Sequence, residues 1–285
     1  MEQNTIIAAT DFSRRAGNAA KRAALLCRQN GCRLTLVHAI NLRFFERLLV
    51  GERRHQLKED VTRKLENDFK ALQAPGDILV EIGSPNEVVL DTARIRQPKL
   101  IVLGDHGEFH LKDVLLGTTA RHIVEQAHLP ILVVKNDNEA PYRNIFLATD
   151  FSDSSKKAIE LALSLFPDAQ YMLYHAYLVP GDMISSRYGF DAGEVEQMLT
   201  QMRQEALEKM DRFKADLGGA LASAKSVVRA SASPTEDILA DSVEQKADLL
   251  VMGTRGMGSF MPLMVGSITD TLLRHSTSDM LVYKA

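Results

Sequence analysis

The sequence predicts an α/β protein made of two tandem copies of one doubly wound domain, each built on a parallel sheet. The first reason is an internal repeat, because Ile6–Ser13 returns as Ile145–Ser152 and Gly104–Gly107 returns as Gly253–Gly256. The second reason is that short, near-continuous apolar runs alternate with helical patterns in each half. Such runs are typical of strands covered on both faces of a parallel sheet. Their alternation with helices indicates a doubly wound domain.

The spacing between the copies locates an insertion and a boundary. Val37–Ala39 returns at an offset of 137 residues, whereas Ser84–Glu87 returns at an offset of 149, so the second copy carries extra residues between them. We place these residues in the polar, glycine-containing stretch 181–193. A polar run that ends in proline separates the copies. The predicted domains are therefore residues 1–140 and 141–285.

The helix after the first strand is marked at both ends. In the first copy, small apolar residues recur at helical spacing from Ala16 to Cys27, and Asn30–Gly31 is a typical stop. Ser13 and its counterpart Ser152 are expected N-cap residues. The strands of the first copy are predicted at five runs rich in β-branched and aliphatic residues: Thr5 to Ala9, Leu34 to His38, Ile78 to Ile82, Leu100 to Leu103 and Ile131 to Val134.

Composition is ordinary for a soluble globular protein, with 25% charged and 45% apolar residues. The net charge of −3 provides no bulk electrostatic reason to bind nucleic acid or an anionic membrane. The first residues lack the basic and apolar regions of a signal peptide, and no apolar run approaches the ~20 residues of a membrane span. We therefore expect a cytoplasmic protein with no membrane or nucleic-acid partner. Cys27 and Cys32 are expected to be buried, apolar side chains.

Ligands of open parallel sheets bind beyond the carboxyl ends of the strands, and each copy places a Thr-Asp pair there. The pair is Thr10–Asp11 in the first copy and Thr149–Asp150 in the second. A carboxylate at this position can accept a hydrogen bond from a ribose hydroxyl or an adenine amino group. The alternative is that the Asp and the nearby Ser only cap the following helix. The sequence leaves both roles open.

A glycine pattern follows the fourth strand of each copy. In the second copy, Gly253 and Gly256 are followed after nine residues by Gly266–Ser267, and the first copy repeats this spacing at Gly104, Gly107 and Gly117–Thr118. Glycines let backbone amides approach a ligand without an intervening Cβ atom. The final pair opens the last long helix, whose free N–H groups and positive dipole end suit a phosphate. The pattern therefore predicts a phosphate-binding turn in each copy.

The second strand of each copy ends in a histidine and an alanine, His38–Ala39 and His175–Ala176. The small alanine leaves room for a flat base. We interpret the histidine as a hydrogen-bonded polar residue at a strand end, and we assign no catalytic role to it.

Together these residues resemble the universal stress protein family in its tandem two-domain form, over essentially the whole chain. The family's ATP-binding pattern, G-2x-G-9x-G-S/T, is matched by the spacing in both copies. The resemblance implies an adenine nucleotide alpha hydrolase-like fold, with a five-stranded sheet of order 3-2-1-4-5 and helices on both faces. It also implies an internal pseudo-dimer through the last strands, Ile131 to Val134 and Met280 to Tyr283. Whether whole chains form a homodimer is left open.

The resemblance further implies which residues surround an adenine nucleotide (ATP, ADP or AMP, with or without Mg²⁺). In the second copy these residues contact ribose, adenine or phosphates: Ala148, Thr149, Asp150, Ala176, Met252, Gly253, Arg255, Gly256, Gly266, Ser267, Ile268 and Thr269. The counterparts in the first copy are Ala9, Thr10, Asp11, Ala39, Leu103, Gly104, His106, Gly107, Gly117, Thr118 and Thr119. The first copy departs from the family at Ala120, where the second copy has the hydroxyl of Thr269.

The charges of the two glycine loops predict unequal sites. The first loop has a formal charge of −2, because Lys112 opposes three acids, Asp105, Glu108 and Asp113. The second loop contains only Arg255, which gives +1. Two like unit charges 6 Å apart repel by about 2–3 kcal/mol at an effective dielectric constant of 20, and by less when exposed. We therefore expect the second copy to be the stronger ATP site and the first to be weak, metal-dependent or specific for another ligand.

The expected function is stress-response regulation through adenine-nucleotide binding rather than catalysis. An ATP-using enzyme is the first alternative, but the chain lacks a P-loop and a Gly-rich turn after the first strand. Slow ATP hydrolysis or autophosphorylation at Ser267 stays open. A nucleotide-independent scaffold is the second alternative, with an unknown protein partner docking on the insertion around Tyr188 or on the basic stretch Arg43 to Arg54. Two weaker alternatives are a receiver-like pairing of Asp11 with Lys135 and a metal cluster of Asp105, His106 and His110.

Overall fold

The structure, a computed structural model, describes residues 4–42, 52–107, 116–179, 191–254 and 266–284. The chain divides into two compact units, Met1–Pro141 and Tyr142–Tyr283. Most of the insertion predicted at 181–193 therefore lies outside the described residues.

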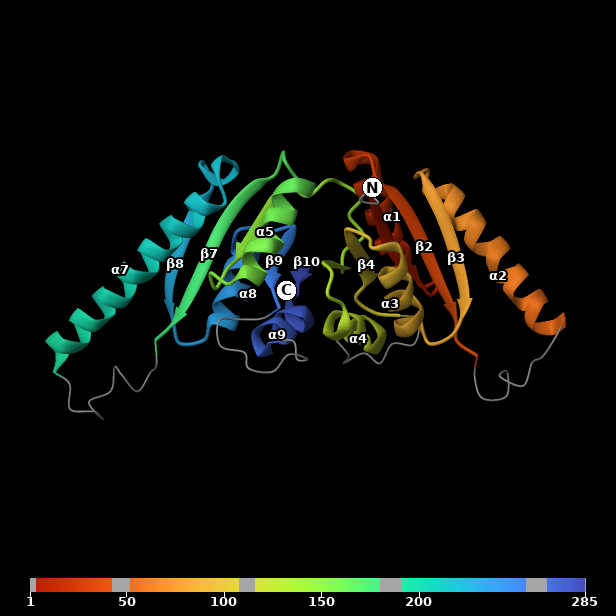
Figure 1. Cartoon of the computed structure of the whole chain (residues 1–285). Coiled ribbons are helices and arrows are strands. Elements are labelled where there is room, and N and C mark those ends of the chain that lie inside the picture. Colours follow the sequence, from red (N-terminus) through yellow and green to blue (C-terminus); the bar gives the residue numbers. More distant parts are fainter. Residues whose placement is uncertain (1–3, 43–51, 108–115, 180–190, 255–265, 285) are drawn as a thin grey trace. The chain divides into compact units, whose positions relative to one another are not determined.

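The first unit alternates strands and helices along the chain (Figure 1). Its strands pair in parallel in the order β3-β2-β1-β4-β5. All five predicted strands are confirmed, with one or two residues added at some ends. The elements are β1 (Thr5–Thr10), α1 (Arg14–Asn30), β2 (Arg33–Ile40), α2 (Glu52–Ala71), β3 (Gly76–Ile82), α3 (Pro85–Arg96), β4 (Leu100–Gly104), α4 (Thr118–Gln126) and β5 (Ile131–Val134).

The second unit repeats this arrangement, with parallel strands in the order β8-β7-β6-β9-β10. Each unit therefore has the strand order 3-2-1-4-5 that the resemblance implies. The elements are β6 (Asn144–Ala148), α5 (Asp153–Leu165), β7 (Gln170–Leu178), α7 (Ala192–Asp216), a 3₁₀ turn η3 (Gly219–Leu221), β8 (Lys225–Ser231), α8 (Pro234–Glu244), β9 (Leu249–Gly253), α9 (Ser267–His275) and β10 (Asp279–Tyr283).

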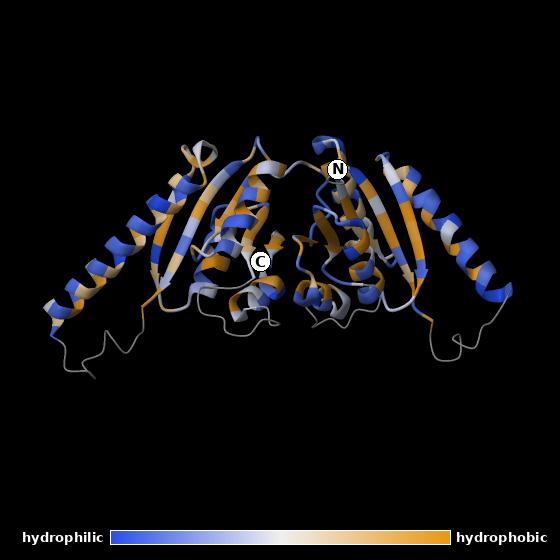
Figure 2. Ribbon diagram, in the orientation of Figure 1, coloured by the Kyte–Doolittle hydropathy of each residue, from blue (hydrophilic) through white to orange (hydrophobic). Residues whose placement is uncertain are grey.

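Helices cover both faces of each sheet, as the uninterrupted apolar strands predict. In the first unit α1 packs on β1, β4 and β5, while α3 and α4 pack against each other. Ala19 and Ala23 of α1 are fully buried, so this helix lies close to the equally buried Ile7 and Ile101 of the sheet. Each such aliphatic side chain contributes about 1.5–3 kcal/mol on burial. Figure 2 shows hydrophobic residues gathered on the strands and hydrophilic residues over much of α2 and α7.

The predicted ends of the first helix of each unit are confirmed. The Ser13 side chain accepts the Ala16 N–H in α1, and the Ser152 side chain accepts the Ser155 N–H in α5. Gly31 ends α1 in the left-handed conformation, with φ of 61°. The two cysteines are buried, as expected. No helix in the described part of the chain is both long and apolar enough to cross a bilayer. The pairing through the last strands stays a prediction.

Candidate functional site

In the first unit, local hydrogen bonds build the turn that follows β1. The Thr10 hydroxyl accepts the Phe12 N–H at 3.1 Å, and the Asp11 Oδ1 accepts the Ser13 N–H at 3.0 Å. Ser13 then caps α1 by accepting the Ala16 N–H at 3.2 Å. Asp11 thus uses one carboxylate oxygen in the turn, while Ser13 caps the helix. The role of Asp11 in ligand binding stays a prediction.

The second unit builds the same turn after β6. The Thr149 hydroxyl accepts the Phe151 N–H at 2.9 Å, and the Asp150 Oδ1 accepts the Ser152 N–H at 3.1 Å. Two further bonds appear here: the Ser152 hydroxyl donates to Asp150 at 2.5 Å, and the hydroxyls of Thr149 and Ser155 lie 2.9 Å apart. Asp150 therefore accepts a hydrogen bond from the Ser152 hydroxyl in addition to the one from the Ser152 N–H.

Each turn contains a phenylalanine in the left-handed conformation, with φ of 65° at Phe12 and 64° at Phe151. This conformation is an outlier for a bulky residue and is found at sites where the surroundings enforce it. The rings pack against His38 and His175, with centroids 4.4 and 4.2 Å apart. The sequence carries no signal for this geometry.

The two histidines are satisfied, as predicted. Nδ1 of His38 lies 2.8 Å from the Thr10 carbonyl oxygen, and Nδ1 of His175 lies 2.8 Å from that of Thr149. A carbonyl oxygen only accepts, so Nδ1 carries the proton. Burial lowers the pKa of both imidazoles, which favours the neutral form. The histidines thus fix the strand ends that carry Thr10 and Thr149.

The first glycine of each pattern serves the packing of a helix on a strand. A Cβ atom at Gly104 would lie 3.0 Å from the Arg15 carbonyl carbon in α1. At Gly253 it would lie 2.7 Å from the Ser155 nitrogen in α5. These glycines therefore let the first turn of the helix approach the strand, a role different from the ligand clearance expected from the sequence.

The later glycines bring the two chain segments of the first site together. A Cβ atom at Gly107 would lie 2.6 Å from Oδ2 of Asp11, so this glycine allows the loop to reach the carboxylate. The Gly117 N–H donates to the Asp105 carbonyl at 2.7 Å and closes the loop at its base. In the second unit the Gly266 N–H closes the loop in the same way, on the Thr254 carbonyl at 2.9 Å.

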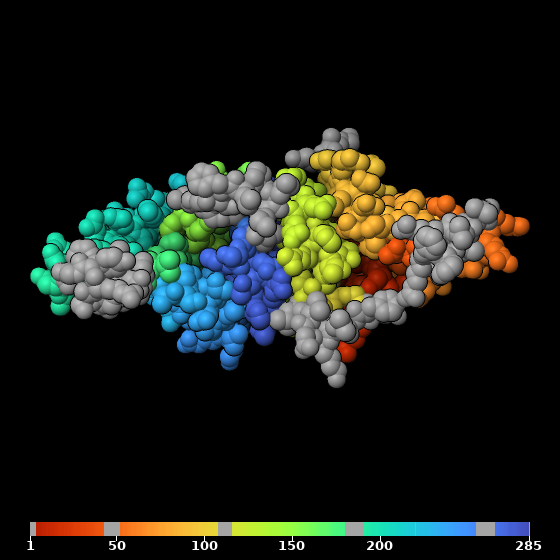
Figure 3. All heavy atoms as spheres, turned by 90° about the horizontal axis from the view of Figure 1, so that it is seen from below, coloured from red at the N-terminus to blue at the C-terminus, as the bar shows by residue number. Residues whose placement is uncertain are grey.

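The helices after these loops begin without a side-chain cap. Gly117 precedes α4 and Gly266 precedes α9, and neither offers a side chain to the first turn. The N–H groups of a first helical turn have no partner within the helix, and the helix dipole makes that end positive. Thr118 and Ser267 are exposed there. Figure 3 looks onto this edge of the first unit, where red residues from the first part of the chain are recessed beside the yellow-green α4.

The negative charge of Asp105 is offset by a neighbouring basic side chain in the first unit. It is buried, and its Oδ2 lies 3.2 Å from the Arg15 guanidinium and 3.0 Å from Nδ1 of His106. Arg15 also donates to the Lys135 carbonyl at 2.6 Å. The charge that the sequence assigned to Asp105 is therefore compensated, and His106 is turned toward Asp105.

The remaining predicted residues occupy three kinds of position. Leu103, Ala148 and Met252 are buried under the edge, whereas Ala9, Ala39, Ala176 and Thr119 are half-buried at it. Ile268 is exposed, but Thr269 is buried, and its hydroxyl donates to the Gly253 carbonyl at 3.2 Å. The described part of the chain does not include Arg255, Gly256 or His110, the charged loop residues Glu108, Lys112 and Asp113, or Tyr188 of the insertion.

Known proteins match the chain over both units. The profile of the universal stress protein family matches residues 3–135 and again 141–284. Universal stress protein MJ0577 of Methanocaldococcus jannaschii is 30% identical over 155 residues, which cover 47% of this chain and 95% of that protein. Universal stress protein Rv1996 of Mycobacterium tuberculosis is 24% identical over 240 residues, covering 80% of this chain and 72% of that protein.

Solved structures show the same fold over the full length. A universal stress protein from Archaeoglobus fulgidus matches with a TM-score of 0.65 at 18% identity, covering 100% of this chain and 99% of its own. A functionally unknown protein from Pseudomonas aeruginosa, PA1789, matches with a TM-score of 0.70 at 17% identity, covering 99% and 92%. Since the family profile matches twice, once in each unit, the chain belongs to the universal stress protein family as a tandem two-domain member.

Proposed function

We propose that each unit binds an adenine nucleotide at the carboxyl edge of its sheet, and that the chain is a nucleotide-responsive regulator of a stress response. One observation carries this proposal: the Asp11 carboxylate, Gly107 and the uncapped start of α4 converge although they are distant in the sequence. The amides suit phosphoryl oxygens, the carboxylate suits a ribose hydroxyl, and the small Ala39 leaves space for the base.

We further propose that the second unit is the tighter site. With Arg15 counted because it pairs with Asp105, the formal charge of the first loop is −1 rather than −2: three acids (Asp105, Glu108, Asp113) against two bases (Lys112, Arg15). The second loop keeps its single positive charge, from Arg255. A triphosphate is therefore still disfavoured in the first unit, and Mg²⁺ would reduce that difference by offsetting the phosphate charge.

Calorimetric titration of ATP, with and without Mg²⁺, tests both proposals. Gly266→Asp places a carboxylate at the start of α9 and is expected to remove the tighter binding event. Gly117→Asp is the matched variant for α4 and is expected to remove only the weaker event. Equal losses of stoichiometry and affinity from the two variants would refute the asymmetry. Hydrogen exchange of each unit checks that both variants fold.

The proposal is one of binding rather than turnover. A ligand changes a conformational equilibrium only through its different affinities for the two states, so slow hydrolysis is compatible with a regulator. Multiple-turnover hydrolysis faster than about 1 s⁻¹ would favour an enzyme. A protein that purifies without nucleotide and whose melting does not respond to ATP would favour a scaffold. We also propose that the protein is cytoplasmic and that it acts through a protein partner.

A further inference from the structure

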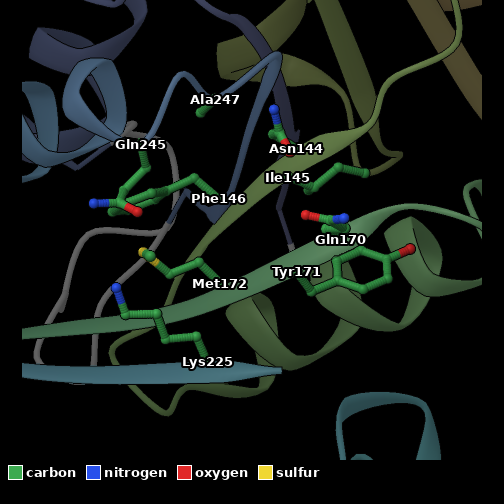
Figure 4. Close-up of a pocket in the computed structure, with 9 residues that line it drawn as sticks. All are labelled: Asn144, Ile145, Phe146, Gln170, Tyr171, Met172, Lys225, Gln245 and Ala247. Atoms are coloured by element: carbon green, nitrogen blue, oxygen red, sulfur yellow. The ribbon is translucent and has the colours of Figure 1, made fainter. Parts of the chain in front are cut away.

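The second unit has a pocket at the amino ends of its strands, opposite the edge that carries the proposed nucleotide site. Its volume is about 220 Å³, and it lies where β6, β7 and β8 begin (Figure 4). Nine residues line it: Asn144, Ile145, Phe146, Gln170, Tyr171, Met172, Lys225, Gln245 and Ala247.

The pocket has an apolar floor and a polar rim. Phe146, Met172 and Lys225 are neighbours across three strands, since Phe146 pairs with Met172 and Met172 pairs with Lys225. Phe146 is buried, whereas Lys225 and Gln245 are exposed. Figure 4 shows the Lys225 ammonium on the same side as the Met172 sulfur, while the Tyr171 hydroxyl points away. That hydroxyl donates to the Phe166 carbonyl.

The same place in the first unit carries a hydrogen-bonded polar cluster. Thr35 pairs with Asp77 across β2 and β3, as Met172 pairs with Lys225 across β7 and β8. Arg96 and Gln245 each lie eleven residues after the proline that begins α3 or α8. Arg96 donates to Asp77 at 2.6 Å and to Thr35 at 3.0 Å, and the Thr35 hydroxyl donates to Asp77 at 2.8 Å.

The second unit therefore has no counterpart of this hydrogen-bonded cluster among the residues that the structure describes. A threonine, an aspartate and an arginine become Met172, Lys225 and Gln245. None of the nine lining residues is acidic, and Lys225 is the one charged residue among them. Within the part of the chain that the structure describes, no acid pairs with Lys225, and no hydrogen bond occupies the side-chain amides of Gln170 and Gln245.

We propose that this pocket binds a small organic anion with a single apolar ring or a short apolar chain and one carboxylate. The apolar body would lie on Met172, beneath which Phe146 is buried, and the carboxylate would accept hydrogen bonds from Lys225 and Gln245. The size agrees, because a dry cavity of about 150 Å³ already holds benzene and 220 Å³ leaves room for the carboxylate.

An NMR titration of the full chain with benzoate tests the proposal, with benzamide as the uncharged control. We expect saturable shifts of the amides that line the pocket, with a Kd of about 1 mM, and weaker effects from benzamide. Lys225→Gln, a substitution at an exposed position, should weaken benzoate binding about ten-fold. The triple variant M172T/K225D/Q245R, which copies the first unit, should abolish it.

Three outcomes would overturn the proposal: no saturable shift up to about 20 mM benzoate, equal binding of benzamide, or unchanged binding by Lys225→Gln. The single variant keeps the test decisive if the triple variant fails to fold. Gly266→Asp should leave benzoate binding unchanged, so this site and the nucleotide site can fail independently.

Discussion

The carboxyl edges of the two units repeat each other closely, whereas their amino edges differ in chemistry. At the carboxyl edge the histidine Nδ1 lies 2.8 Å from a threonine carbonyl in both units, and the following phenylalanines share φ values of 65° and 64°. At the amino edge the first unit carries an Arg-Asp-Thr cluster, and the second has a pocket. The comparison indicates that the two units share a specific geometry at the carboxyl edge, whereas their amino edges carry different side chains.

The largest expected effect comes from adding a Cβ atom where β9 meets α5. Gly253→Ala would place that atom 2.7 Å from the Ser155 nitrogen and 2.8 Å from the Ser154 hydroxyl. We expect the free energy of unfolding of the second unit to fall by about 3 kcal/mol, and that of the first to fall by about 1–2 kcal/mol for Gly104→Ala. Native-state hydrogen exchange measures each unit separately, since a two-domain chain need not unfold in one step.

The control for this pair is Gly17→Ala. Gly17 lies within α1, and no atom lies within 4 Å of its Cβ position. Alanine there should stabilise the first unit by about 0.5–1 kcal/mol, because glycine is a poor helix former. If Gly253→Ala were tolerated as well as Gly17→Ala, the close approach of helix and strand would not explain the repeated glycine.

The next effect tests whether the two turns after β1 and β6 are equally strong. Ser13→Ala removes an N-cap bond and should cost the first unit about 1 kcal/mol. Ser152→Ala also removes the bond that the Ser152 hydroxyl donates to Asp150, so we expect about 2 kcal/mol. Threonine at either position should restore much of the loss. Equal losses, measured by hydrogen exchange, would show that the extra bond contributes nothing.

A smaller effect is a shared dependence of stability on pH. Burial lowers the pKa of His38 and His175 in the folded protein, so the unfolded chain binds these protons more readily. Stability is therefore full above the usual pKa of 6.5 and falls as the pH drops below it. His175→Asn keeps a donor for the Thr149 carbonyl and should flatten the pH dependence of the second unit alone. The measurement is the melting temperature from about pH 7.5 to about pH 5, which should fall on acidification. A rise would contradict the prediction.

The sequence predicts local features of both units well. The strand positions, the Ser13 and Ser152 caps and the Gly31 stop depend on residues close to one another in the chain, and all are confirmed. The left-handed Phe12 could not be predicted, because its conformation depends on the Thr10 bond and on packing against His38 from the next strand.

Long-range contacts also give two predicted site residues roles that differ from those expected from the sequence. Gly104 is required by the first turn of α1, near Arg15, which only the folded sheet brings beside it. The same Arg15 neutralises Asp105, so a charge counted along the sequence overstates the difference between the loops. Pattern and spacing locate a site, whereas the partners of each residue depend on the tertiary fold.

The smallest expected effect separates two explanations of unequal nucleotide binding. Thr269 is buried, and its hydroxyl donates a hydrogen bond to the Gly253 carbonyl. The residue at the same position in the first unit is Ala120, which has no hydroxyl. Thr269→Ala should therefore cost the second unit about 0.5–1 kcal/mol and change its affinity for ATP by less than about two-fold. Ala120→Thr is the reciprocal variant and should not strengthen the first site. If Thr269→Ala instead weakened ATP binding more than about ten-fold without loss of stability, the hydroxyl would contact the nucleotide. The asymmetry would then depend on that one side chain rather than on the loop charges.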